Sequence, residues 1–372
     1  MQKNWFCLGM MSGTSGDGVD TSIIKTNGID QYELIQDKYF EYDSDIYKDI
    51  HILKDKIHKI GDLKSFNNEL NILERKLTIF HAEVIKQLNL NDETIIGFHG
   101  QTIFHDSDER ISRQLGNGDL LNKLVKKTVV FDFRRNDILN GGEGAPLTPI
   151  FHQLICTQKK IKLPVCFLNI GGISNITIVK DLKDTTELFS RDIGPGNCLI
   201  DSWVRKNSKK KFDKDGKFAL SGTKNQIIFE QAQELYSNRK NKEKKSFDTN
   251  DFDISFSRGL NLEDGAATLT DFTASVVSEK LSLYLKKYNQ PVKEILLCGG
   301  GRKNKVLIKK IKNYLPTNIN LKLIDEYQID GDFIESQAFA FLAIRSLLRL
   351  PISFPSTTGC ESPSLGGKLI KN

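Results

Sequence analysis

The sequence predicts an α/β protein built from two related halves. Short apolar runs typical of buried strands alternate with longer segments whose apolar residues recur at helical spacing. One glycine hairpin opens the chain at residues 9–20, and a second opens the other half at residues 169–175. Because the theme repeats, we expect an internal duplication, with domains at residues 1–160 and 161–372 and a cleft between them.

The composition is that of an ordinary globular protein, with 39% apolar and 27% charged residues over 372 positions. The net charge of +6 is diffuse, and lysine-rich stretches at 209–211 and 242–245 are typical of solvated surface, with nucleic-acid contact as the alternative. The six cysteines form no C-x-x-C pair, a pattern that favours reduced thiols over disulfides or zinc. Neither a signal peptide nor a membrane-length apolar run is present, so we expect a cytoplasmic protein without nucleic-acid or membrane partners.

The first hairpin places glycines and hydroxyl residues between predicted strands at 5–11 and 19–26. Glycines let backbone N–H groups approach an anion, and the hydroxyls add donors. The two acids of the loop would repel phosphate unless a divalent cation lay between them, so the loop predicts a nucleotide with Mg²⁺. A plain glycine-rich turn is the alternative. The residues expected to hold the nucleotide here are Gly13, Thr14, Ser15, Gly16, Asp17, Gly18, Val19 and Asp20.

Two groups of polar residues follow predicted strands in the rest of the first half. An extended segment at 32–42 and helices over 43–59 and 64–88 precede a short strand at 94–98. His99 and Gln101 come directly after that strand, where open α/β sheets place ligand contacts.

Residues 114–119 are predicted to form a turn. A predicted strand at 128–133 then leads to Arg134 and a glycine loop at 141–147. The guanidinium of Arg134 suits a carboxylate or phosphate, with a structural salt bridge as the alternative. Pro146 is expected to begin the next helix.

The second half opens with strands at 165–170 and 174–179 around Gly171 and Gly172. A strand at 187–193 then delivers Asp192 to a loop that contains Gly194 and Asn197, and a helix begins near Cys198. Helix amides close to Asp192 would keep its carboxylate ionised, as a general base requires. Capping of that helix is the alternative role.

The last third predicts surface insertions at 206–216 and 238–256 and a long helix over 264–288. A strand at 294–298 leads to Gly299, Gly300, Gly301 and Asn304, an arrangement that suits a nucleotide's base and sugar but is a weak signal alone. A strand at 321–324 and a helix over 332–350 with Glu335 complete the chain. The core face expected for the long helix comprises Ala267, Leu269, Phe272, Val276 and Leu283.

The chain carries, in order, the motifs Ser12-Gly-Thr-Ser-x-Asp-Gly-x-Asp20, Gly97-x-His-Gly-Gln-Thr102, Asp132-Phe-Arg134, Gly141-Gly-x-Gly-Ala-Pro-Leu147, Asn169-Ile-Gly-Gly-Ile-x-Asn175, Asp192-x-Gly-Pro-Gly-Asn197, Cys298-Gly-Gly-Gly-x-x-Asn304 and Glu335-x-x-Ala-Phe-Ala340. Taken together, these motifs resemble those of the anhydro-N-acetylmuramic acid kinase family, in the family's order. The resemblance implies a two-domain actin-like ATPase with a ribonuclease H-like duplication, an ATP cleft between the domains, and a last helix that packs back on the first domain. It also implies a homodimer.

The resemblance further implies a reaction in which ATP phosphorylates 1,6-anhydro-N-acetylmuramic acid while water opens the anhydro bridge. The products are N-acetylmuramic acid 6-phosphate and ADP, and the role is recycling of cell-wall sugar. Asp192 would be the base and Glu335 a second acid that orients the water, with an ordinary exposed helix acid as its alternative. The residues expected to contact the sugar are His99, Gln101, Arg134, Gly194 and Asn197.

The chain departs from the family pattern at Gly16, where a larger residue is usual, at Phe131, and in the segment 245–250. Two other functions compete with the implied reaction. A plain sugar kinase would phosphorylate a free hydroxyl without attack by water. A sugar-sensing regulator without catalysis would usually carry a DNA-binding helix-turn-helix, for which the chain leaves no room upstream of residue 12.

Overall fold

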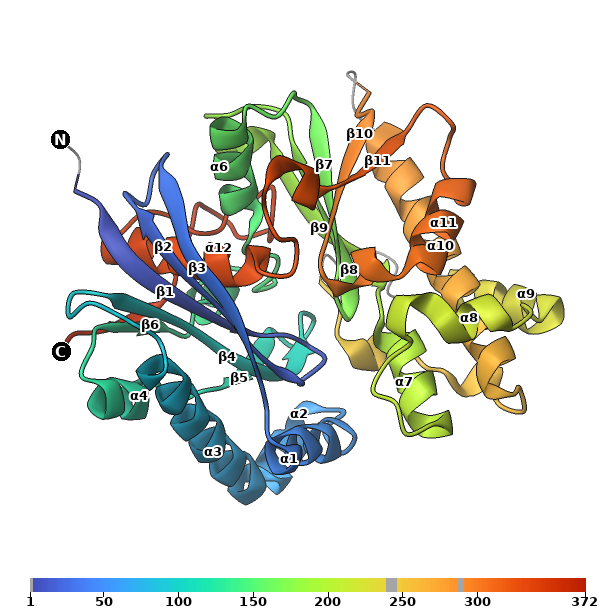
Figure 1. Ribbon diagram of the computed structural model, residues 1–372, viewed down its shortest axis with the longest axis horizontal. Coiled ribbons are helices and arrows are strands. Elements are labelled where there is room, and N and C mark those ends of the chain that lie inside the picture. The colour runs from blue at the N-terminus through green and yellow to red at the C-terminus, as the bar shows by residue number, and fades with distance from the viewer. Residues whose placement is uncertain (1–2, 239–245, 287–290) are drawn as a thin grey trace. The chain divides into compact units, whose positions relative to one another are not determined.

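The computed structural model describes residues 3–238, 246–286 and 291–372, and the chain forms two compact units (Figure 1). Unit 1 consists of Met1–Ile161, Asp181–Phe189 and Asp332–Asn372, and unit 2 of Lys162–Lys180 and Ser190–Gly331. The chain therefore returns to unit 1 for its last helix. The lysine-rich stretch at 242–245 and the expected end of the long helix at residue 288 lie outside the described residues.

Unit 1 is organised around a sheet in the order β12-β6-β4-β1-β2-β3, with β5 paired to β4. The first hairpin forms its centre, because β1 pairs antiparallel with β2 and parallel with β4. The strands are β1 (Trp5–Ser12), β2 (Gly18–Thr26), β3 (Tyr32–Glu41), β4 (Ile95–Asp106), β5 (Ile111–Leu115), β6 (Val129–Phe131) and β12 (Lys368–Ile370).

The two faces of this sheet are covered by different helices (Figure 1). Leu8 and Met10 of β1 join a buried cluster with α1 and α3, whereas Gly9, which points to the opposite face, lies against the backbone of α12. The helices of unit 1 are α1 (Ser44–Lys54), α2 (Ile60–Ser65), α3 (Asn67–Lys86), α4 (Gly118–Val125), α5 (Arg135–Leu139), α6 (Pro149–Lys159) and α12 (Ile334–Leu347).

Unit 2 is organised around a sheet in the order β11-β10-β7-β8-β9. As in unit 1, its first strand pairs antiparallel with the second and parallel with the fourth. The five-strand order β3-β2-β1-β4-β6 thus recurs as β9-β8-β7-β10-β11, which confirms the predicted α/β class with an internal duplication. The strands are β7 (Val165–Ile170), β8 (Ile173–Val179), β9 (Leu188–Pro195), β10 (Glu294–Cys298) and β11 (Asn320–Leu323).

The helices of unit 2 gather around α10 (Leu262–Lys286), which is buried along most of its length. The expected core face of α10 is confirmed at four positions and wrong at Leu283, whose side chain is 48% exposed. The other helices are α7 (Cys198–Asn207), α8 (Lys217–Ser221), α9 (Gln226–Ser237) and α11 (Lys305–Tyr314). Short 3₁₀ turns lie at Lys214–Gly216, Thr249–Asp251, Ser255–Ser257, Gly300–Lys303 and Ile324–Tyr327 in unit 2, and at Thr185–Glu187 in unit 1.

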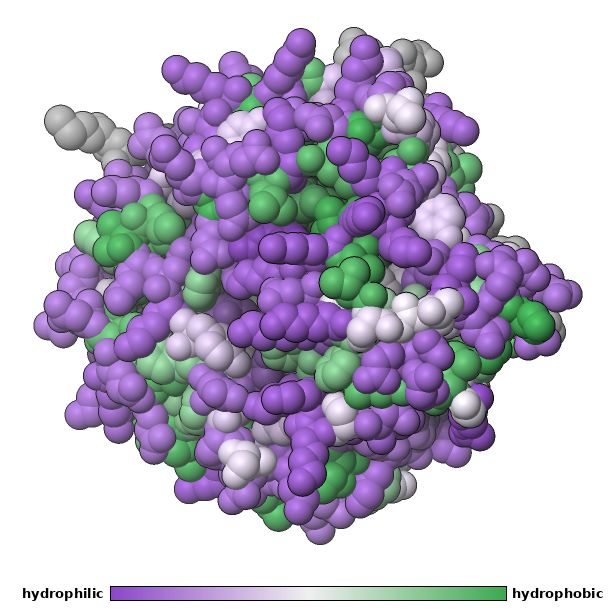
Figure 2. All heavy atoms as spheres, turned by 45° about the vertical axis from the view of Figure 1, so that its right-hand side comes forward, coloured by the Kyte–Doolittle hydropathy of each residue, from purple (hydrophilic) through white to green (hydrophobic). Residues whose placement is uncertain are grey.

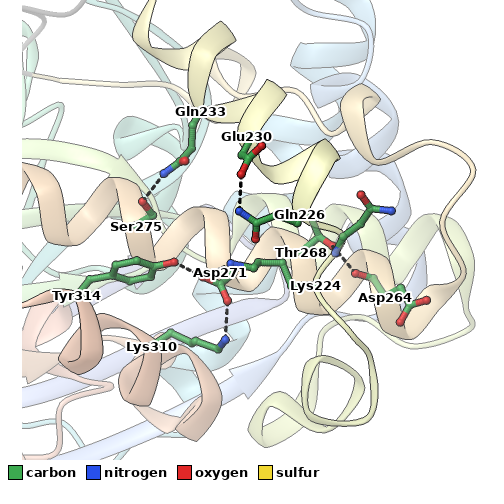
Figure 3. A network of polar contacts seen from close by, with 11 residues as sticks. Lys224, Gln226, Glu230, Gln233, Asp264, Thr268, Asp271, Ser275, Lys310 and Tyr314 are labelled. Atoms are coloured by element: carbon green, nitrogen blue, oxygen red, sulfur yellow. Dashed lines mark hydrogen bonds and ion pairs between the residues drawn. The ribbon is translucent and has the colours of Figure 1, made fainter.

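A polar network fastens α10 to its neighbours (Figure 3). The buried carboxylate of Asp271 accepts hydrogen bonds from Lys310 and Tyr314 of α11, and Lys224 lies 3.9 Å away. Burial and the adjacent carboxylate raise the pKa of Tyr314, so its phenol remains a donor. The network is therefore a structural ion cluster that holds α11 on α10.

Three further local predictions are wrong. His99 and Gln101 lie inside β4, which continues to Asp106 because its second half pairs with β5. A strand and a helix, β5 and α4, include parts of the expected turn at 114–119. The helix after the glycine loop begins at Pro149 and not at Pro146.

The surface drawn in Figure 2 is mostly hydrophilic, with small separate hydrophobic patches. Among the residues that the structure describes, no helix combines the length and the apolar character needed to cross a membrane.

Candidate active site

The first hairpin of unit 1 is held by a buried hydrogen-bond cluster around Ser12. The Ser12 hydroxyl contacts Gln101 Oε1 at 2.6 Å, the Tyr42 hydroxyl at 2.8 Å and the carbonyl of Gly18 at 3.1 Å. Gln101 Nε2 also donates to the carbonyl of Gly13 at 2.9 Å. Both ends of the loop are therefore held by Tyr42, which follows β3, and by Gln101 of β4.

Gln101 consequently serves the hairpin itself. Its amide oxygen and nitrogen both bond to loop residues, and its side chain is fully buried. Direct contact of Gln101 with a sugar stays a prediction. A supporting role explains why a glutamine is buried inside a strand, since every polar atom there needs a partner.

The loop between the two strands is a tight turn closed by a bond from the Gly16 N–H to the Gly13 carbonyl, 3.1 Å long. Gly16 has φ +62°, a conformation that favours glycine, and an added Cβ would lie 2.8 Å from Ile50 Cγ2. The glycine that departs from the family pattern thus fits both its backbone conformation and its neighbour.

The acids of the hairpin could hold a divalent cation through a nucleotide. Asp17 Oδ1 accepts a bond from the Ser15 hydroxyl at 2.6 Å, and Asp20 lies on β2 opposite Met11. The described residues contain no group of three or more side chains arranged to hold a metal. Because Mg²⁺ in kinases is bound by one or two carboxylates together with phosphate oxygens and water, these two acids fit that ion.

A second cluster in unit 1 orients Arg134. His99 Nδ1 donates to the Gly100 carbonyl at 2.7 Å, so Nε2 is the acceptor for Arg134 Nε at 3.1 Å and Nη2 at 3.0 Å. Arg134 Nη1 donates to the carbonyl of Gly144 at 2.8 Å. Burial and the neighbouring guanidinium hold the pKa of His99 well below 6.5, so the imidazole is neutral and acts as an acceptor.

The glycine loop that receives Arg134 depends on a residue that the sequence analysis missed. The fully buried carboxylate of Asp137 accepts bonds from the Gly144 N–H at 2.7 Å and the Thr358 hydroxyl at 2.6 Å. An added Cβ on Gly142 would lie 2.2 Å from Asp137 Oδ2. The sequence pattern that could have identified Asp137 is an acid three residues after the arginine, followed by closely spaced glycines.

Glu335 lies in the first turn of α12 and is half-buried. Its neighbours fix that turn to the sheet, because Ser336 contacts the Ser22 hydroxyl at 2.6 Å and Gln337 Nε2 donates to Asp37 at 3.0 Å. The start of α12 is thereby held at a defined position on β2 and β3.

In unit 2, the second hairpin is bonded to the start of α7. The Gly196 N–H donates to the Gly172 carbonyl at 2.9 Å, and the Asn197 N–H donates to the Gly171 carbonyl at 2.8 Å. The Asn197 side chain also donates to Gly171 at 3.1 Å. The two glycine loops therefore form one hydrogen-bonded assembly, and contact of Asn197 with a sugar stays a prediction.

Asp192 lies in β9, just before this assembly, and its side chain is 7% exposed. Its Oδ2 accepts a bond from the Phe247 N–H at 2.8 Å. The Phe247 ring packs on Phe252, with ring centroids 5.5 Å apart. A backbone donor at this distance stabilises the charged carboxylate, and no sequence pattern indicated that Phe247 would supply it.

The three glycines after β10 have different surroundings. An added Cβ on Gly299 would lie 2.3 Å from Asn169 Oδ1, and one on Gly301 would lie 2.3 Å from Ile170 Cγ2. Nothing lies within 4 Å of the corresponding position on Gly300. Asn304 accepts a bond from the Leu307 N–H at 3.0 Å and so caps α11. Its contact with a nucleotide stays a prediction.

The structure thus brings the expected site residues together in two sets. Unit 1 holds the first hairpin with Gln101, the pair formed by His99 and Arg134, and Glu335. Unit 2 holds the second hairpin, the loop with Gly194 and Asn197, the carboxylate of Asp192 and the triple glycine.

Comparison with known proteins gives one family. A family model described as anhydro-N-acetylmuramic acid kinase matches residues 5–372. The anhydro-N-acetylmuramic acid kinase of Pelagibacter ubique (strain HTCC1062) is 52% identical and is matched over 100% of both chains. Those of Agrobacterium fabrum (strain C58 / ATCC 33970) and Zymomonas mobilis subsp. mobilis (strain ATCC 31821 / ZM4 / CP4) are 34% and 36% identical, and the matches cover 98% and 97% of this chain and 98% of each relative. The chain belongs to the anhydro-N-acetylmuramic acid kinase family.

Proposed function

We propose that this chain uses ATP to phosphorylate O6 of 1,6-anhydro-N-acetylmuramic acid while water opens the anhydro bridge. The products are N-acetylmuramic acid 6-phosphate and ADP, and the reaction serves recycling of cell-wall sugar. The observation that carries the proposal is the match to one kinase family from residue 5 to residue 372. The buried carboxylate and the glycine loops of the structure support it.

Asp192 is the general base of the proposed reaction. A backbone N–H bond to a carboxylate favours its charged form, which can take a proton from water. As the water oxygen bonds to C1, the C1–O6 bond breaks, and O6 then bonds to the γ-phosphorus while the bond to ADP breaks. Attack on the face opposite the bridge corresponds to the geometry of an inverting glycosidase. Glu335 orients the water.

The glycine hairpins hold the phosphates in this proposal. Phosphoryl transfer depends mainly on positioning and charge stabilisation, which loops fixed by buried hydrogen bonds provide. Asp17 and Asp20 would hold Mg²⁺ on the nucleotide, and the ion would neutralise phosphate charge there. Arg134, oriented by neutral His99, binds the lactyl carboxylate or the acetamido group of the sugar.

Replacing Gly300 with Ala should weaken ATP binding about tenfold without changing the melting temperature. Apart from its chain neighbours, a methyl group at this position meets no protein atom within 4 Å, so a loss of ATP affinity would come from contact with the bound adenosine. Calorimetric titration with ATP measures the effect. Gly61→Ala, which also adds a methyl group in open space, is the matched control. Unchanged ATP affinity in Gly300→Ala would show that adenosine binds elsewhere.

The reaction itself is tested by incubating the purified protein with ATP, Mg²⁺ and the anhydro sugar and analysing the products by mass spectrometry. We expect N-acetylmuramic acid 6-phosphate, with label at C1 when the reaction runs in ¹⁸O-water. A phosphorylated product without label would instead indicate a plain sugar kinase, and no phosphorylated sugar would contradict both enzymes. The homodimer stays a prediction, which sedimentation velocity would test.

A further inference from the structure

Helix α1 of unit 1 contacts the first hairpin through two residues, Ile50 and Lys54. Ile50 lies under Gly16, where an added Cβ would be 2.8 Å from its Cγ2 atom. Lys54, the last residue of α1, donates from Nζ to the carbonyl of Thr14 at 2.7 Å. Because residues four apart share one face of a helix, Ile50 and Lys54 both face the hairpin.

This contact places a positive charge at the turn of the hairpin. The turn itself contains a carboxylate, Asp17, and a second acid, Asp20, follows on β2. A nucleotide adds several negative charges to such a loop, whereas backbone N–H groups contribute only partial positive charge. A lysine ammonium on a flexible four-carbon stem brings a full positive charge to this turn.

We propose that Lys54 binds the phosphate chain of the nucleotide at the first hairpin. The inference rests on the proposed function only in taking ATP as the nucleotide. In the absence of nucleotide Lys54 is held over the turn by the Thr14 carbonyl, and it pairs with phosphate oxygens when the nucleotide binds. Lysine is a common phosphate-binding residue in kinases and ATPases, where it acts as a point charge.

A purely structural role is the competing explanation, in which Lys54 only fastens the turn through Thr14. Three substitutions separate the roles. Lys54→Arg keeps the charge, Lys54→Gln keeps a hydrogen-bond donor without charge, and Lys54→Met removes both. The control is Lys76→Met. Lys76 is an exposed lysine of α3 that pairs with Asp49 of α1.

The experiment measures the dissociation constants of ATP and adenosine by calorimetry, without sugar, together with melting temperatures. We expect Lys54→Met and Lys54→Gln to weaken ATP binding about 10- to 100-fold, and Lys54→Arg and Lys76→Met to bind within about threefold of the original chain. Adenosine binding should be equal in all five proteins.

Restoration of ATP affinity by Gln, an equal loss of adenosine affinity, or an unchanged affinity in Lys54→Met would each overturn the proposal. Since no sugar is present, an original chain that binds ATP but does not phosphorylate the anhydro sugar would contradict the proposed function and leave this inference standing. An original chain that does not bind ATP would overturn both.

Discussion

Asp192→Asn should abolish turnover while ATP still binds. Asparagine has the shape of aspartate, and its amide oxygen can accept the N–H of Phe247, so β9 and the loop that follows should keep their structure. The amide cannot take a proton from water, however, and general bases contribute on the order of 10²–10⁴ to enzymatic rates. We expect a loss of at least that size in formation of the 6-phosphate.

Single-turnover product formation and calorimetric titration with ATP measure the two parts of this prediction separately. Asp253→Asn is a suitable control and should turn over normally, since Asp253 is another acid of unit 2 and accepts its described hydrogen bonds from nearby Ser255. Turnover at the original rate in Asp192→Asn would remove the base assignment. Loss of ATP binding in that variant would show that its effect is not confined to proton transfer.

Gly9→Ala should cause a large loss of stability in unit 1. An added Cβ would lie 1.9 Å from the carbonyl oxygen of Ser336 and 2.5 Å from the backbone nitrogen of Ala340. Both atoms belong to the backbone of α12, which cannot rotate away as a side chain can. Overpacking usually costs about 1–3 kcal/mol, and here the helix itself must move, so we expect about 3 kcal/mol or more.

Urea unfolding followed by circular dichroism measures this loss as a shift in the transition midpoint. Turnover should fall as well, because α12 carries Glu335 beside the displaced Ser336. Gly13→Ala is the matched control for the midpoint, since the nearest non-neighbouring atom to its added Cβ would be Ser15 Oγ at 3.6 Å. An unchanged midpoint for Gly9→Ala would mean that α12 lies farther from β1 than the structure places it.

The elements that the sequence predicted well are those determined by local pattern. Both glycine hairpins, the strand that carries Asp192 and the helix that carries Glu335 were expected within a few residues of their observed ends. The extension of β4 was missed because polar residues such as His99 and Gln101 interrupt its apolar run. Their burial depends on partners elsewhere in the chain, which spacing does not reveal.

The prediction that Leu283 is buried was wrong for a different reason. Helix α10 is buried around most of its circumference, so apolar residues recur on several sides and their spacing does not identify the exposed one.

The sequence predicted which residues lie in the candidate site better than it predicted what each side chain does there. Gln101, Asn197 and Asn304 are residues that often bind ligands, but here their side chains bond to the loops and helix beside them. Sequence alone does not separate these roles, because the partner of Gln101 lies 88 positions away. The residues missed, Asp137 and Lys54, act on glycine loops from positions outside the recognised motifs.

The return of the chain to unit 1 affects how the protein folds during synthesis. Every residue of unit 2 leaves the ribosome before α12 and β12, whereas the sheet of unit 1 needs both to cover β1 and to complete its edge at β6. Domains generally fold as they emerge, from the N-terminus onward. In this chain the half that is translated first should be the last to reach its native state, and the face of β1 that α12 covers stays exposed in the interval.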